Sequence, residues 1–344
     1  MMRLTGGFSL CERLTSSGLQ ILCYHGISRL DEHLAAPQLF MSKELFSARM
    51  AWLKRKGYRV LALEDALERL DCGDLPSRAI VITFDDGWYG CLEGGFDELV
   101  SLGYPATMYV TTYYVQKQFP IFNVAVPYLL WRGRQLTLDL RELNDALVGR
   151  ANLTNLKQRA IAAGQITNFG CSFLGSQDRT DLLYRLAEQV GVDPVNLFER
   201  QRVYTLMNRE ELMEAAAMGI DIQLHTHRHR FPLDDENALR REIADNRKVL
   251  LASGKIETHH LCYPGGFYDS KVFAVLRSEG IKTATTTEAG LNYQGGERLA
   301  LGRFLDGENI SPIEFHGEMA GVGEVIRRLR AGCPPWLNTR HFQQ

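Results

Sequence analysis

The chain has 344 residues, of which 45% are hydrophobic and 23% charged, as in an ordinary soluble globular protein. This composition excludes a disordered chain, a collagen-like repeat and a small disulfide-rich scaffold. The formal net charge is −2 without long runs of one sign, so binding to nucleic acid is not expected. The length fits one large domain with an insertion as well as it fits two domains.

The seven cysteines are odd in number and form no C-x-x-C pair, which indicates reduced, buried thiols. The first twenty residues contain no apolar stretch typical of a signal peptide. A run of about 18 apolar residues, as a membrane-spanning helix needs, is also absent from the sequence. We therefore expect a cytoplasmic protein, with peripheral contact at the inner face of a membrane left open. The oligomeric state is also left open.

From residue 21 to residue 112, short apolar runs alternate with segments of helical periodicity, as in parallel strands joined by crossover helices. Strands are predicted over 21–27, 58–63, 79–84 and 106–112. Helices are predicted between Ser42 and Gly57, over 63–70, and over 96–102 before Gly103. The strand over 79–84 is almost wholly apolar, which is typical of a parallel strand buried on both faces.

The segment from about residue 113 to residue 204 interrupts this alternation and predicts a mainly helical insertion in a single domain spanning 1–344. After it, helices are predicted between Asn208 and Gly219, over 236–253 and over 271–280. Strands are predicted over 220–225, 259–263 and 281–287. About seven strand and helix alternations, interrupted once, favour a barrel-like α/β architecture.

Two adjacent carboxylates, Asp85 and Asp86, follow the apolar strand 79–84 in the segment TFDDG at 83–87. Catalytic groups of α/β barrels lie at the carboxyl ends of strands. Two like charges at such a place are costly unless a metal ion or a shared proton relieves them. An acidic turn or helix start is the alternative interpretation.

Three of the nine histidines fall in the segment HTHRH at 225–229, again directly after a predicted strand. His225 and His229, with one carboxylate, would make a suitable site for zinc or another first-row divalent metal. The alternative is a solvated loop rich in histidine.

A third segment, LCYPGG at 261–266, follows another apolar strand. Its proline fixes the chain, and its glycines allow the backbone N–H groups to approach a developing oxyanion. Taken alone, a plain turn is the better interpretation.

The order TFDDG, then HTHRH, then YPGG, each at a strand end, resembles the polysaccharide deacetylase family with its NodB homology domain. Tyr24-His25-Gly26 and Leu75-Pro76 resemble the longer, exopolysaccharide-type members. The resemblance covers roughly residues 21–310 apart from the insertion. It implies a deformed (β/α) barrel that removes N-acyl groups from amino sugars with the help of a metal ion.

The resemblance makes Asp85 the general base and makes Asp86, His225 and His229 the metal ligands. The metal expected is Zn²⁺, with Co²⁺, Ni²⁺ or Mn²⁺ as alternatives. In this scheme Asp85 takes a proton from a water molecule activated by the metal, and the resulting hydroxide attacks the amide carbonyl.

The third segment would supply the substrate and oxyanion contacts, namely Tyr263, Pro264 and Gly265, with a backbone N–H near Gly265 facing the oxyanion. Between the predicted ligands, Thr226 would orient a histidine or the loop. His227 matches no ligand position and is expected either behind the ligands or facing solvent.

Two features depart from the family. An arginine that many members carry shortly before the proline of the third segment is missing, and Arg303 is a candidate to replace it as the partner of Asp85. An ordinary surface arginine is the alternative. The late histidine that donates a proton to the leaving amine has no clean counterpart. His316 is the only late candidate, but an exposed helix residue is the favoured interpretation. His25 is the other candidate, for the proton donor or for a substrate contact, and a core histidine is its alternative.

The insertion contains aromatic residues that either stack on sugar rings or form the insertion's own core, and the core is favoured. These are Tyr113, Tyr114, Phe119, Phe122, Tyr128 and Trp131. The whole pattern predicts a metal-dependent hydrolase that removes N-acetyl groups from an amino sugar of a cell-surface polysaccharide or its precursor. The alternatives are a deformylase or other amidohydrolase, and a catalytically inactive glycan-binding domain. A carbohydrate is the expected partner.

Overall fold

The computed structural model describes residues 6–254 and 256–332, and it is organised around one parallel sheet. Seven strands follow the order β11-β10-β9-β6-β5-β1-β12, and an eighth, β4, pairs with β5. This curled sheet with its helices confirms the predicted deformed (β/α) barrel. Its strands are β1 (Gln20–Tyr24), β4 (Arg59–Val60), β5 (Ala79–Phe84), β6 (Ala106–Val110), β9 (Ile220–Leu224), β10 (His260–Cys262), β11 (Thr283–Thr285) and β12 (Phe304–Leu305).

Helices connect and flank these strands. Those outside the inserted segment are α1 (Gly7–Leu14), α2 (Glu32–Ala35), α3 (Lys43–Lys56), α4 (Leu63–Cys72), α5 (Tyr89–Cys91), α6 (Asp97–Leu102), α11 (Arg209–Ala217), α12 (Glu236–Ala252), α13 (Phe273–Ser278), α14 (Pro312–Met319) and α15 (Val322–Arg330). In the part of the chain that the structure describes, no helix combines the length and the apolar character needed to cross a membrane.

The local signals in the sequence explain where these elements begin and end. The Ser42 side chain accepts a hydrogen bond from the Leu45 N–H at the start of α3, and Gly57 ends that helix in the left-handed conformation. Asn208 and Glu211 form a reciprocal capping box at the start of α11. Strand β5 is buried at all of its positions, as its apolar sequence predicts for the middle of a parallel sheet.

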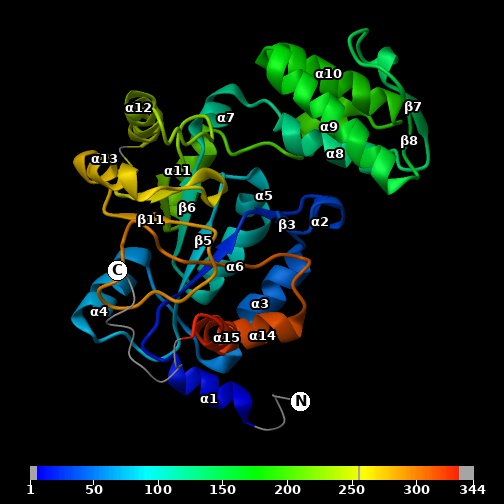
Figure 1. Ribbon diagram of the computed structural model, residues 1–344. Helices are drawn as coiled ribbons and strands as arrows, with labels where there is room; N and C mark the ends of the chain where they lie inside the picture. Colours follow the sequence, from blue (N-terminus) through cyan, green and yellow to red (C-terminus); the bar gives the residue numbers. More distant parts are fainter. Residues whose placement is uncertain (1–5, 255, 333–344) are drawn as a thin grey trace.

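The inserted segment leaves the sheet after β6 and returns to it at β9, which pairs directly with β6. It is mainly helical, as predicted, and forms a lobe beside the sheet (Figure 1, green). Its α-helices and strands are α7 (Thr112–Lys117), α8 (Phe122–Arg132), β7 (Thr137–Asp139), β8 (Arg150–Asn152), α9 (Leu156–Phe173) and α10 (Ser176–Gln189). Phe122 and Tyr128 are buried in it, as the core interpretation predicts, whereas Tyr113 and Tyr114 are half-buried.

Several elements differ from the expectations. Strand β4 keeps only two residues of the six predicted, because it reaches only the first two positions of β5. The strand predicted over 21–27 is divided into β1 and the short β2 (Gly26–Ile27), and the strands β3 (Phe40–Met41) and β12 were not predicted. The prediction that the cysteines are buried is wrong for Cys72 and Cys171, which are exposed. Cys333 lies outside the described residues.

Candidate active site

The acidic, histidine-rich and glycine-rich segments meet at one end of the sheet. Asp85 and Asp86 follow β5, His225 follows β9, and His25 follows β1. These strands run parallel, with Tyr24 opposite Phe84 and Val110 opposite Leu224 in the register. Their carboxyl ends therefore share one rim of the barrel, which is where α/β barrels place reacting groups.

Asp86, His225 and His229 form a compact cluster on this rim. Asp86 Oδ1 lies 3.3 Å from His225 Nε2 and 3.4 Å from His229 Nε2. The backbone at Asp86 and His229 is left-handed, with φ of 73° and 55°. Side chains rarely adopt this conformation, and such strained positions gather at ligand-binding and catalytic sites.

Contacts behind this cluster fix the donor atoms. His225 Nδ1 lies 2.9 Å from the Cys262 carbonyl oxygen. A carbonyl can only accept, so Nδ1 carries the proton and Nε2 keeps its lone pair in the neutral ring. The Trp88 indole N–H donates to Asp86 Oδ2 at 2.8 Å, which leaves Oδ1 directed at the two histidines. One carboxylate oxygen and two imidazole nitrogens fit a first-row divalent metal.

Charge and burial act against each other on these ligands. Burial disfavours the charged form of Asp86, but the hydrogen bond that His225 donates when its ring is protonated, together with the neighbouring His229, outweighs it and holds the pKa of Asp86 below its usual range. Burial alone would lower the pKa of His225, whereas Cys262 and Asp86 raise it well above the usual value. His229 is only partly buried, and this loss of contact with water lowers its pKa.

Asp85 is buried and paired with Arg303, which is itself completely buried. The guanidinium donates from Nη1 to Oδ1 and from Nη2 to Oδ2, both at 2.7 Å. Burial would raise the pKa of Asp85, but the charge of Arg303 and its hydrogen bonds overcome that effect and lower it. Arg303 also donates to the Thr286 carbonyl and to Thr83 Oγ1. The interpretation of Arg303 as a surface residue is therefore wrong.

Two further groups of potential metal ligands overlap this pair: Cys23, His25 and Asp85, and Asp85, His225 and Cys262. Both require Asp85, whose two oxygens already accept from Arg303. A cation at either place would lie beside the guanidinium charge, which is electrostatically unfavourable. The group built on Asp86 is therefore the best candidate metal centre among the described residues.

The glycine-rich segment reaches the rim through its backbone. Tyr263 is buried and donates from its hydroxyl to the Leu299 carbonyl at 2.7 Å, so its side chain is directed into the protein. Pro264 is buried, and Gly265 and Gly266 are both left-handed, with φ of 67° and 75°. A Cβ at Gly266 would lie 2.0 Å from Thr287 Oγ1, so this turn requires glycine.

The remaining histidines divide between the rim and other places. His25 is half-buried, with Nε2 3.9 Å from Asp85 Oδ2. His227 is buried and bonded to Thr112 Oγ1 through Nδ1, so it lies behind the ligands and the solvent-facing alternative is wrong. Thr226 accepts from the Arg230 N–H within the same loop. His316 lies on α14 as expected, but it is half-buried and stacks on Trp52 instead of being exposed.

Sequence reasoning missed the residues that support the site from a distance. Asn246 on α12 accepts from the His225 N–H and donates to the Val110 carbonyl, which ties β6 to the histidine loop. Trp88 directly follows the TFDDG segment, and its indole N–H was an available signal. Asn246 carried no comparable signal, because one asparagine in a long helical pattern does not reveal which face it occupies.

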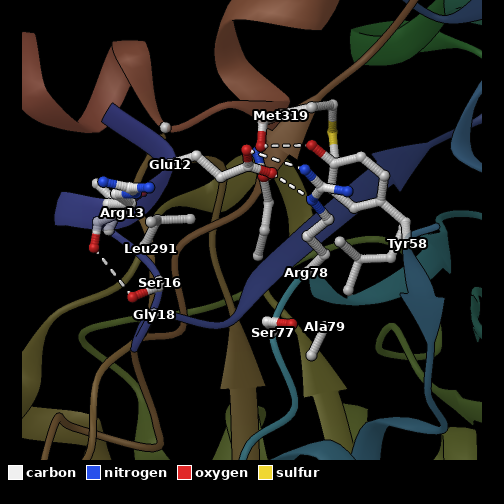
Figure 2. Close-up of a pocket in the computed structure, with 14 residues that line it drawn as sticks. Glu12, Arg13, Ser16, Gly18, Tyr58, Ser77, Arg78, Ala79, Leu291 and Met319 are labelled. Atoms are coloured by element: carbon white, nitrogen blue, oxygen red, sulfur yellow. Dashed lines mark hydrogen bonds and ion pairs between the residues drawn. The ribbon is translucent and has the colours of Figure 1, made fainter. Parts of the chain in front are cut away.

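The cavity shown in Figure 2 lies away from this rim. Its volume is about 330 Å³, and its lining includes Gln20 at the start of β1 and Ala79 at the start of β5. The candidate site follows the opposite ends of the same strands. Within the cavity Arg78 pairs with Glu12, and Tyr58 donates to the Met319 carbonyl (Figure 2). Its most prominent charged pair is thus already matched, and the cavity is separate from the metal-ligand cluster.

Comparisons with known proteins agree with the resemblance seen in the sequence. A family model described as polysaccharide deacetylase matches residues 175–284, which include the histidine-rich and glycine-rich segments. Over 93 residues the chain is 33% identical to the Bacillus subtilis protein YxkH, whose name places it provisionally among polysaccharide deacetylases. That match covers 27% of this chain and 31% of the relative.

Solved structures show the same fold at low identity. The Streptococcus pyogenes deacetylase PplD, in complex with acetate, has a TM-score of 0.57 at 18% identity, covering 88% of this chain and 98% of that one. IcaB from Ammonifex degensii has a TM-score of 0.54 at 17% identity, covering 88% and 96%. The family model and the partial sequence match therefore confirm the resemblance of this chain to the polysaccharide deacetylase family, and the solved structures confirm the fold.

Proposed function

We propose that this protein is a metal-dependent hydrolase that removes N-acetyl groups from an amino sugar of a cell-surface polysaccharide or its precursor. The observation that carries the proposal is that two adjacent carboxylates on one rim have different partners. Asp85 is held by Arg303, and the adjacent Asp86 converges with two imidazoles. One carboxylate is thus available for proton transfer while its neighbour binds a metal ion.

Asp86, His225 and His229 would hold the metal, for which Zn²⁺ is the first candidate by donor type. When bound, a divalent metal supplies Lewis-acid activation of the attacking water and of the amide carbonyl. Asp85 accepts the proton of that water. Because Arg303 keeps Asp85 ionised, the base is in its proton-accepting form across the neutral pH range.

The other steps fall to the residues around this pair. A backbone N–H near Gly265 would face the oxyanion of the tetrahedral intermediate, because Gly265 itself carries no side chain to block the approach. His25, with Nε2 close to Asp85, is the candidate donor of a proton to the leaving amine. Tyr263 and Pro264 would act through the shape of the turn, since both side chains are buried.

The substrate class rests on the family and on its solved members. PplD is a deacetylase whose structure contains acetate, the acid that N-deacetylation releases. An amide of an amino sugar matches both the family name and a site that combines a proton acceptor with a metal centre.

The test is acetate release from a panel of N-acetylated oligosaccharides and lipid-linked sugars by the zinc-loaded protein. We expect turnover that a chelator abolishes. Asp85→Asn should keep the metal and lose activity, whereas His225→Ala should lose both. His259→Ala is the matched control, because His259 is a partly exposed histidine whose Nε2 lies near Glu257 and away from the rim.

The products separate the proposal from its alternatives. Release of formate from N-formylated sugars without acetate release would identify a deformylase. Tight metal and glycan binding without any acid released would identify a binding domain, and either result would refute deacetylation.

A further inference from the structure

Two buried cysteines direct their thiols at the same oxygen of Asp85. Cys23 Sγ lies 3.5 Å from Asp85 Oδ2, and Cys262 Sγ lies 3.3 Å from it. Each thiol has a second acceptor in the carbonyl of the next residue, but at 3.8 Å and 3.7 Å those contacts are longer. Both side chains are excluded from solvent, with at most 1% exposed. Water therefore does not compete for either thiol.

The two sulfurs reach Asp85 from different parts of the sheet. Cys23 lies on β1, which pairs with β5, whereas Cys262 ends β10, which is separated from β5 by β9 and β6. Only the curling of the sheet brings Cys262 to the carboxylate. Cys262 also accepts a hydrogen bond from Arg303 Nη2 at 3.1 Å, so it bridges the guanidinium and the carboxylate.

We propose that Cys23 and Cys262 are positioning residues, whose S–H groups donate to Asp85 Oδ2 and fix the orientation of the carboxylate beside the Asp86 cluster. Arg303 binds the edge of the carboxylate, and the two thiols restrain it from two directions. A thiol is a weak donor, so it orients an oxygen with little competition for its negative charge. This suits a carboxylate that must still accept a proton.

The hydrogen bonds can be tested on the metal-free protein by infrared spectroscopy of the S–H stretch, which falls in a region clear of other protein bands. A hydrogen bond to a carboxylate weakens the S–H bond and lowers its stretching frequency. We expect Cys23→Ala and Cys262→Ala each to remove one low-frequency band, and Asp85→Asn to move both bands upward. Bands that keep their positions in Asp85→Asn would overturn the proposal, because the thiols would then donate elsewhere.

The positioning role rests on the proposed function and is tested by kinetics on a panel sugar that the wild-type protein deacetylates. We expect kcat to fall roughly threefold to tenfold in each alanine variant, with KM and zinc content unchanged, as for the loss of one weak hydrogen bond. Serine at either position should restore part of kcat, because a hydroxyl also donates. Cys11→Ala is the control: it removes another buried thiol, on α1, which does not touch Asp85.

The two measurements distinguish two kinds of failure. A wild-type protein that releases no acetate would refute the proposed function, while the infrared bands would still decide whether the thiols bind Asp85. Wild-type kcat in both alanine variants of an active enzyme would refute the positioning role. A loss shared equally by Cys11→Ala would refute it too, because the effect would then be one of packing.

Discussion

Replacing Arg303 by methionine removes the positive charge from the most deeply buried ion pair of the site. Neither partner has more than 3% of its surface exposed. The guanidinium donates to four acceptor groups, namely the Asp85 carboxylate, the Thr286 carbonyl, Thr83 Oγ1 and Cys262 Sγ. Removing one member of a buried pair costs about 3–5 kcal/mol, because the other charge is left without compensation. We expect Arg303→Met to lower the free energy of unfolding at pH 7 by about that amount.

The loss should depend on pH in a defined direction. In the wild type the lowered pKa of Asp85 contributes stability that is present above the usual value of about 4 and is lost as pH falls further. Without Arg303, burial raises the pKa of Asp85, so the variant binds the proton more readily than the unfolded chain does. The difference in free energy of unfolding between the wild type and Arg303→Met should therefore become smaller as pH falls from about 7 toward about 4.

Urea unfolding of wild type, Arg303→Met, Asp85→Asn and the double variant, all free of metal, tests this reasoning. The double variant should recover part of the stability that Arg303→Met loses, since no charge is then buried alone. A loss below about 1 kcal/mol, or a double variant less stable than Arg303→Met, would show that the buried charge of Asp85 is not the cause.

Three further predictions each concern a single residue. Trp88→Phe removes the indole N–H that orients Asp86. Calorimetric titration should then show a zinc affinity reduced roughly tenfold to a hundredfold, with the fold retained. An unchanged affinity would contradict the orienting role. Gly266→Ala should lower the melting temperature clearly more than Gly280→Ala. Both glycines are left-handed, but only at Gly266 would the added Cβ collide with a neighbouring side chain, that of Thr287. Equal losses in the two variants would argue against that clash. Burial raises the pKa of Asp306 to about 6, so the stability that this carboxyl contributes is full below about pH 4 and is lost as pH rises through about 6. In Asp306→Asn the melting temperature should therefore change less with pH over this range. An unchanged dependence on pH would assign it to another group.

The parts of the site that the sequence predicted depend on local order along the chain. Asp85, Asp86 and His225 come directly after apolar runs, and the carboxyl ends of parallel strands meet on one rim, so their proximity follows from the fold class. The buried character of β5 and the caps of α3 and α11 likewise follow from short segments of sequence.

The parts that could not be predicted depend on how the sheet curls. Strand β12 has two residues, too few for a hydrophobic period, although its pairing with β1 brings Arg303 to Asp85. The two thiols at Asp85 lie on β1 and β10, whose separation across the sheet is invisible in the sequence. His227 and His229 differ by only two positions, yet one is buried and the other half exposed because the loop turns sharply at left-handed residues.

The pairing of β12 with β1 also bears on the order in which the protein is completed during synthesis. Asp85 leaves the ribosome 218 residues before Arg303. Until the later segment arrives, a buried Asp85 would lack its counter-charge, which disfavours closing this end of β5. We therefore expect the rim to stay open to water while most of the chain is made, and the candidate site to be one of the last parts of the barrel to form.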